Sequence, residues 1–151
     1  MSLEEDLRAR LTQSIKNRDL RTANVIRMIN TRITERRTAA DFKGQLDDAQ
    51  IRDLIAAYKK SLEKARVEFA NAGEKGVAHV AELDFEIAFC QGFLPAQLDR
   101  ATVTEAVRAA IAELGATDKK SVGRVTGAVM KKHRGEVDAA VVKEIAESLL
   151  D

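Results

Sequence analysis

The sequence predicts an all-α protein made of two helical subdomains. Apolar residues recur at helical spacing along most of the chain, and there is no pair of strand-like runs joined by a hairpin turn. The only proline, Pro95, separates a region of long amphipathic repeats from one of short segments bounded by glycines. Because proline cannot continue a helix, we expect an N-terminal subdomain of about four helices over residues 1–94 and a C-terminal three-helix subdomain over residues 95–151.

Composition excludes several classes of protein. The chain has 151 residues, 45% hydrophobic and 32% charged, so it is long enough to bury a core and too apolar to be disordered. No apolar run approaches the roughly 18–20 residues that span a membrane, and the acidic, amphipathic start is unlike a secretory signal. A single cysteine cannot form an internal disulfide framework or a multi-cysteine zinc site. We therefore expect a cytoplasmic protein without a membrane partner.

Two N-terminal helices are predicted from caps and apolar spacing. Ser2 and Glu5 form a capping box for a helix that ends near Asn17, and Asp19 can cap the second helix. The expected buried positions are Leu3, Leu7, Leu11 and Ile15 in the first helix and Ala23, Ile26, Met28, Ile29 and Ile33 in the second. Six arginines occupy the other face of the second helix, as a solvated or a second contact surface: Arg18, Arg21, Arg27, Arg32, Arg36 and Arg37.

A loop over residues 38–46 and two further helices complete this subdomain. Asp47, with Gln50 three residues on, opens a third helix that stops near Gly73. Its apolar positions are Ile51, Leu54, Ile55, Tyr58, Leu62, Ala65 and Phe69. Residues 80–89 fit both the alternation of a strand and the stripe of a helix. We favour a helix, because a lone strand would leave its backbone hydrogen bonds unmade.

Three short helices follow the proline. Each is expected to begin at a capping residue, and the first two are expected to end at a glycine. The expected caps are Thr102, which forms a capping box with Glu105, then Asp118 for the second helix and Asp138 for the third. The glycines are Gly115 and Gly135. The middle helix of the three is expected over about residues 119–132.

Residues suited to catalysis are scattered. His79 and His133 lack partners at metal-ligand spacing, and Cys90 sits on an apolar stripe, where a buried structural thiol is the usual role. Glu82 and Glu86 would share a helix face as an acid/base or metal pair, although such pairs are more often solvated edges. No glycine-rich phosphate loop follows a strand. We expect no catalytic residues, no metal and no cofactor.

The segment from residue 119 to residue 135 is basic and contains no acidic residue. Its cations are Lys119, Lys120, Arg124, Lys131, Lys132 and Arg134. Gly123 and Gly127 are one helical turn apart, and each costs a helix roughly 1 kcal/mol relative to alanine. This cost suggests close approach to the backbone, either by a neighbouring helix or by a nucleic-acid backbone.

The position of the cations along that helix is informative. The helix dipole favours Lys131 and Lys132 at its C-terminal end but disfavours Lys119 and Lys120 at its start, so helix stability alone does not explain the second pair. A basic surface without interleaved aromatic residues suits phosphate contacts and shape recognition rather than base stacking. Phosphate binding and a plain solvated face remain the two interpretations.

Several short motifs, in order, resemble a known family. They are Arg18-Asp19 with residues 25–29, the segment from Phe93 to Leu98 around the proline, residues 115–117, and residues 123–130 followed by Gly135, Asp138 and Val142. Together they resemble the YqeY family, whose tail is similar to the C-terminal domain of the B subunit of the tRNA-dependent amidotransferase. The chain departs from the family pattern at Ala139, where a glycine is common, and in the loop over residues 38–46.

The resemblance implies two all-helical subdomains and a link to tRNA. It implies an accessory protein, non-catalytic by itself, whose basic segment contacts tRNA phosphates; no DNA partner is expected. The family label of carbon–nitrogen ligase activity with glutamine as amido-N donor comes by association, since catalytic domains are absent from this chain. An alternative is a module that docks an amidotransferase or an aminoacyl-tRNA synthetase through the long helices. A third hypothesis, participation in the chemistry, needs Glu82, Glu86 or Cys90 to act.

Overall fold

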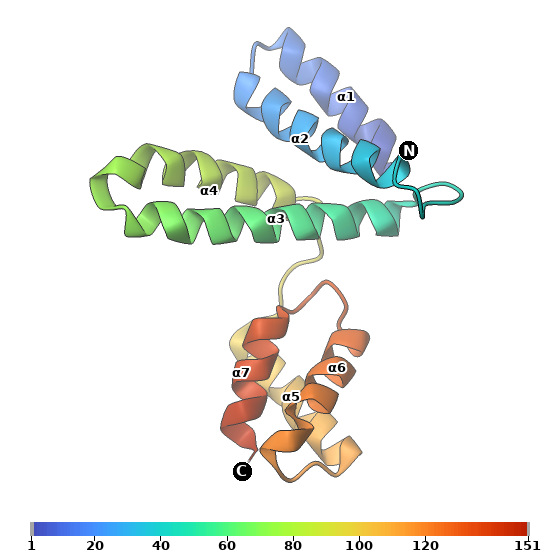
Figure 1. The fold of residues 1–151 in the computed structure, drawn as a ribbon, viewed down its shortest axis with the longest axis vertical. Coiled ribbons are helices and arrows are strands. Elements are labelled where there is room, and N and C mark those ends of the chain that lie inside the picture. The colour runs from blue at the N-terminus through green and yellow to red at the C-terminus, as the bar shows by residue number, and fades with distance from the viewer. Residues whose placement is uncertain (1, 151) are drawn as a thin grey trace. The chain divides into compact units, whose positions relative to one another are not determined.

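The computed structural model describes residues 2–150, which are helical with no strand among them (Figure 1). The all-α prediction is confirmed. The helices are α1 (Leu3–Lys16), α2 (Leu20–Arg37), α3 (Asp48–Asn71), α4 (Val77–Gln91), α5 (Arg100–Leu114), α6 (Val122–Lys132) and α7 (Ala139–Leu149), with 3₁₀ turns η1 (Gly73–Gly76) and η2 (Lys119–Ser121). The ambiguous residues 80–89 lie inside α4, so the helical interpretation is correct. The chain divides into two compact units between Leu94 and Pro95.

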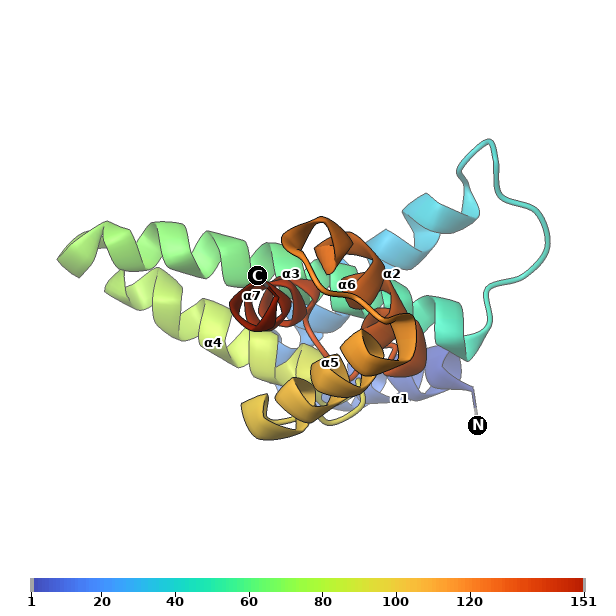
Figure 2. The same cartoon turned by 90° about the horizontal axis from the view of Figure 1, so that it is seen from below.

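The N-terminal unit consists of two helical hairpins, α1 with α2 and α3 with α4 (Figure 1). Their apolar faces form one core, and the loop over residues 38–47 arches away from it (Figure 2). Each fully buried Ile or Leu contributes roughly 1.5–3 kcal/mol. The most deeply buried side chains are Leu7, Val25, Ile26, Ile29, Ile51, Ile55 and Cys90. None of the described helices is both long and apolar enough to cross a membrane.

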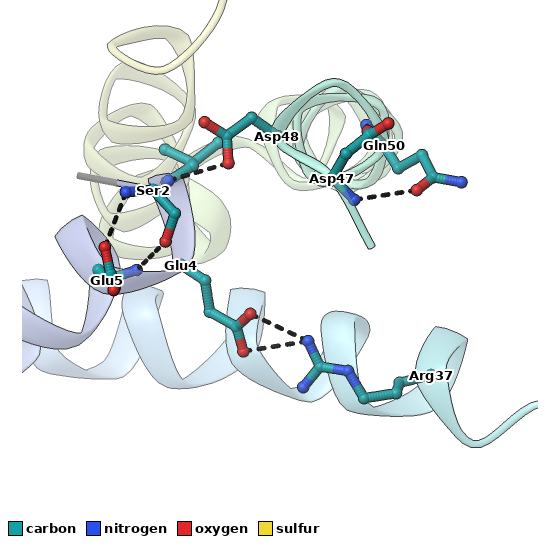
Figure 3. A network of polar contacts seen from close by, with 8 residues as sticks. Ser2, Glu4, Glu5, Arg37, Asp47, Asp48 and Gln50 are labelled. Carbon is teal, nitrogen blue, oxygen red and sulfur yellow. Dashed lines mark hydrogen bonds and ion pairs between the residues drawn. The ribbon is translucent and has the colours of Figure 1, made fainter. Parts of the chain in front are cut away.

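Both predicted capping boxes of this unit are present (Figure 3). The backbone N–H of Glu5 donates to Ser2 Oγ at 3.2 Å, and Ser2 N–H donates to Glu5 Oε2 at 2.9 Å. At α3, Gln50 N–H donates to Asp47 Oδ1 at 2.8 Å, and Asp47 N–H donates to Gln50 Oε1 at 3.0 Å. These bonds satisfy amides that have no partner inside the helix, so each helix start is fixed by its own sequence.

Two polar contacts join the helix ends to one another (Figure 3). The N–H of Leu3 at the start of α1 donates to Asp48 Oδ1 at the start of α3, at 3.0 Å. The guanidinium of Arg37, at the end of α2, donates through Nη2 to both carboxylate oxygens of Glu4, at 3.1 and 3.0 Å. The Leu3–Asp48 hydrogen bond therefore joins the two hairpins, and the Arg37–Glu4 pair fastens α2 to α1 within the first hairpin.

Two of the expected core positions are wrong. Ile15 is 51% exposed and Met28 is 44% exposed. A repeat of four residues overshoots a helical turn by about 40°, so Ile15 lies about 120° around α1 from Leu3. Ser14 lies only about 20° from Leu3 and takes the buried place, with its hydroxyl donating to Arg10 O at 2.7 Å.

The C-terminal unit is a three-helix bundle of α5, α6 and α7 around an aliphatic core. Its most deeply buried side chains are Val103, Val107, Val125, Val129, Val142, Ile145 and Ala146. The segment after the proline is fastened to the loop between α6 and α7: Gln97 Nε2 donates to Gly135 O at 2.9 Å, and Leu98 N–H donates to Glu136 O at 2.8 Å. Gly135 has a φ of 79°, a left-handed conformation that favours glycine.

Two predicted caps in this unit are wrong and one is confirmed. Asp99, not Thr102, caps α5, and Asp99 Oδ1 accepts from Thr102 N–H at 2.7 Å. Hydrogen bonding from the side chain and the backbone N–H of Thr102 lowers the pKa of Asp99 below its usual range. Asp118 caps η2 and not the middle helix: α6 begins at Val122, after Ser121, whose side chain makes no capping bond. Asp138 caps α7 as expected. Asp19 caps α2, and Gly115, with a φ of 63°, closes α5 as expected.

Candidate nucleic-acid interface

The six cations of the basic segment are all exposed around α6. Lys119 and Lys120 lie in η2, Arg124 in the first turn of α6, Lys131 and Lys132 in its last turn, and Arg134 just beyond it. The chain thus places cations at both ends of one short helix of 11 residues.

The helix has an apolar side and a bare side. Its buried residues are Val122, Val125 and Val129. At about 100° per residue, Gly127 points about 160° away from Val125, and Gly123, Arg124 and Lys131 all lie within about 60° of Gly127. Met130 also lies about 60° from Gly127, but it is half-buried against the core of the unit. We call Gly123, Arg124, Gly127 and Lys131 the glycine face. Lys132 is about 140° from Gly127 and so lies beside the buried side, apart from this face.

No described residue fills the space above the two glycines. A Cβ built at either Gly123 or Gly127 meets no heavy atom within 4 Å, counting the described residues and apart from the backbone of α6 itself. The close approach of a neighbouring helix, one of the two explanations expected from the sequence, is therefore not found. The backbone at the glycine face is open to an external molecule.

Five of the six cations of the basic segment lack acidic partners among the described residues. No ion pair joins Lys119, Lys120, Arg124, Lys131 or Lys132 to another described residue. The nearby acids are used elsewhere: Asp118 and Asp138 accept backbone N–H groups at helix starts, and Glu136 lies 3.3 Å from His133 Nδ1. Unpaired cations that share one surface produce a positive potential that attracts anions, most strongly at low ionic strength.

The arginines of α2 contrast with this cluster, because the structure gives most of them partners. Arg21 Nε lies 3.3 Å from Glu82 Oε2, and its guanidinium carbon lies 4.3 Å from the centre of the Phe85 ring. Arg32 lies over Tyr58 at 5.4 Å. The remaining contacts are Arg27 with Asn24, Arg36 with Asp41 and Phe42, and Arg37 with Glu4. Much of this basic face contributes to the packing of the N-terminal unit.

The three residues considered for chemistry all lie on α4, in different environments. Cys90 is fully buried, and burial raises its thiol pKa to about 11, so the thiol is protonated at neutral pH. Burial, together with the charge of Glu82, also raises the pKa of Glu86, while Glu82 itself pairs with Arg21. Within residues 2–150 no three His, Cys, Asp or Glu side chains are grouped as metal ligands. His79 stacks on Phe69, with ring centres 4.4 Å apart.

A groove between α2 and α3 was not anticipated from the sequence. It encloses about 340 Å³. Its lining residues are Arg32, Glu35, Arg36, Ala39, Leu54, Ala57, Tyr58 and Ser61. Its walls come from segments about twenty residues apart, so no local motif could have indicated it. This mixture of apolar and charged lining residues suits an amphipathic partner better than a metal or a small polar substrate.

Comparison with known proteins identifies the family. A family model described as Yqey-like protein matches residues 4–150, which is nearly the whole chain. The resemblance inferred from the sequence motifs is therefore confirmed. A search of the curated proteins finds no match.

Proposed function

The chain belongs to the Yqey-like protein family, and on this premise we propose that it is a tRNA-interacting accessory protein. Its C-terminal unit binds phosphates of the folded RNA, and its N-terminal unit serves as a scaffold. The protein is non-catalytic by itself. The residues that contact RNA are those of the basic segment: Lys119, Lys120, Arg124, Lys131, Lys132 and Arg134.

One observation carries this proposal: five exposed cations on η2 and α6 have no acidic partner among the described residues. A cation that is only needed to solubilise a helix commonly finds an i,i+3 or i,i+4 carboxylate, as Arg108 does with Glu105 at 3.9 Å. Lys119, Lys120, Arg124 and Lys131 have no acid at these spacings, and Glu136, four residues after Lys132, pairs with His133 instead. An arrangement of this kind suits the phosphate backbone, which supplies the missing negative charge.

The test is a titration of bulk tRNA at several salt concentrations. We expect affinity to fall by roughly 0.7–0.9 log units per phosphate contact for each tenfold rise in salt. The variant Lys120→Gln/Arg124→Gln/Lys131→Gln should bind more weakly and with a shallower slope. A matched control, Arg100→Gln/Arg108→Gln/Lys143→Gln, removes the same charge from α5 and α7 of the same unit. Equal losses in the two variants would mean that net charge alone acts, and no binding at low salt would refute the proposal.

The α2/α3 groove supports a second candidate, docking of a protein such as an amidotransferase or a synthetase. Leu54, Ala57 and Tyr58 line the groove with apolar surface, and Arg32, Glu35 and Arg36 line it with charges of both signs. This arrangement suits an amphipathic partner helix whose apolar residues are bordered by charged ones. Purification from cells under low-salt conditions distinguishes the two candidates: RNA retained by the wild type and lost with the α6 variant supports the first, and a protein retained by both supports the second.

A further inference from the structure

We infer that the site takes double-helical RNA in particular, with the glycine face lying against the shallow minor groove and the cations on phosphates at either side. This inference rests on the proposed RNA binding and specifies the class of ligand. Three properties of the C-terminal unit carry it: the absence of aromatic residues from its sequence, the open backbone at Gly123 and Gly127, and the position of the unpaired cations.

Single-stranded nucleic acid is a poor match for this surface. Proteins that hold single strands stack the bases chiefly on aromatic side chains along a basic groove, with arginine planes contributing. Residues 95–151 contain no Phe, Tyr or Trp, and His133, their one imidazole, is half-buried beside Glu136. The glycine face also has no long polar side chain at its centre that would read a base edge. The surface is therefore built to contact a backbone whose bases are already stacked on one another.

Among duplexes, the shape of the glycine face favours the A-form. An α-helix with its side chains is about 10–12 Å wide, too wide for the B-DNA minor groove of about 6 Å. The B-DNA major groove admits a helix, but readout there depends on side chains that the glycine face lacks at its centre. The minor groove of A-form RNA is wide and shallow and displays 2′-hydroxyls. A bare helical backbone can approach such a surface closely.

The backbone of α6 retains hydrogen-bonding capacity for those hydroxyls. Each helical carbonyl has two lone pairs, of which the helix uses one, so a 2′-hydroxyl can donate to the other where no side chain covers the carbonyl. Gly123 and Gly127 leave that approach open. Arg124 and Lys131 are seven residues apart, about 10 Å along the axis, and so would contact separate phosphates beside the groove.

The experiment compares three ligands of one sequence: a 20-base-pair RNA duplex, the matching DNA duplex and the single-stranded RNA. Each is titrated against the full chain at fixed low salt. We expect the RNA duplex to bind at least tenfold more tightly than the other two. The variant Gly123→Ala/Gly127→Ala should lose at least fivefold in affinity for the RNA duplex and little for single-stranded RNA. Binding of both duplexes with equal affinity, or an unchanged affinity in the alanine variant, would overturn the inference.

The alanine variant separates recognition from folding. Alanine is a better helix former than glycine, and the space above both positions is open, so the variant should melt at a higher temperature than the wild type. Weaker binding by a more stable protein cannot result from unfolding. As a second pair, Gly127→Leu should abolish the preference for duplex RNA, whereas Ala109→Leu, at an exposed position of α5, should preserve it. Binding without preference, or failure of all three ligands to bind, would refute this inference, and failure of bulk tRNA to bind as well would refute the proposed function.

Discussion

Helices α2 and α6 are both rich in cations, and the structure uses them in opposite ways. On α2, Arg21 and Arg37 reach carboxylates on α4 and α1, and Arg32 lies over a tyrosine of α3. On α6, Arg124 and Lys131 have no acidic partner in the described chain. The cations of α2 therefore bind groups of their own unit, and those of α6 are left exposed to solvent.

The difference arises from what lies next to each helix. The N-terminal unit contains all the aromatic residues of the chain, and a guanidinium can stack on their faces. The C-terminal unit has an aliphatic core and no Phe, Tyr or Trp ring to stack on. The carboxylates at the helix starts of the C-terminal unit are occupied by capping hydrogen bonds. A basic helix therefore keeps its positive charge exposed where its own fold leaves that charge unneutralised.

The largest expected effect is on RNA affinity. Removing three charges from the α6 region, as Lys120→Gln/Arg124→Gln/Lys131→Gln, should weaken tRNA binding about a hundredfold at low salt, since each phosphate contact is a charge-assisted interaction of about 1 kcal/mol or more. Removing three from α2, as Arg21→Gln/Arg32→Gln/Arg37→Gln, should change affinity less than threefold. Filter binding or fluorescence anisotropy measures both. If the α2 variant lost as much affinity as the α6 variant, the claim that only the α6 cations contact RNA would be wrong.

The two units should also differ in alkaline solution. Burial raises the pKa of Cys90 to about 11 and that of Tyr58 to about 12, and both residues belong to the N-terminal unit. Because each folded pKa lies above the ordinary value, the neutral form is favoured in the fold. The resulting stability is present below the unfolded pKa, about 9 for the thiol and 10 for the phenol, and is lost as the pH rises through the folded pKa.

Methyl NMR over pH 7–11.5 measures this difference unit by unit. Signals from Ile26 and Ile55 report on the N-terminal core, and the signal from Ile145 reports on the C-terminal core. The N-terminal signals should be lost first, because the C-terminal unit has neither cysteine nor tyrosine. Replacing Cys90 with alanine removes one titrating group and should flatten the decline of N-terminal stability between pH 9 and 11. Simultaneous loss of the signals of both units would show that Cys90 and Tyr58 do not determine the alkaline unfolding.

A smaller effect is expected from a single arginine of α2. Arg21→Gln removes both the ion pair with Glu82 and the contact with Phe85, and should lower the free energy of unfolding by about 1 kcal/mol. The expected loss is small because the Arg21 side chain is 51% exposed, so solvent screens its charge. Arg8→Gln is the control, since Arg8 is exposed on α1 without an ion pair among the described residues. Urea unfolding measures both, and equal losses would show that Arg21 is merely a solvated charge.

Local sequence predicted the helix starts and the basic segment because both depend on residues close together in the chain. The capping boxes at Ser2 and Asp47 involve partners three residues away. The error at Thr102 has a local cause: Asp99, three residues earlier, is also a capping residue and captures the Thr102 N–H. Exposure of Ile15 follows from a four-residue repeat that drifts around the helix.

The partners of the α2 arginines could not be predicted in this way. Arg21 and Glu82 are 61 residues apart, and Arg37 and Glu4 are 33 residues apart. No periodicity encodes such pairs, because they depend on how the hairpins pack. The unpaired state of the α6 cations is likewise a property of the fold, although the absence of acids from residues 119–135 was visible in the sequence. The sequence located the candidate site, and packing distinguished it from the arginine face.

The smallest effect tests whether the glycine face is maintained at a cost to stability. Gly127→Ala adds a methyl group where no atom lies within 4 Å, at a helical position without positive φ, so it should stabilise the protein by about 0.5–1 kcal/mol. Gly115→Ala is the matched opposite: its φ of 63° is unfavourable for alanine, and the change should destabilise by about 1 kcal/mol. Thermal unfolding of the two variants measures the expected gain in stability at Gly127 and the expected loss at Gly115. A loss of stability at Gly127 would mean that the backbone there is already packed, and the open face on which RNA recognition depends would not exist.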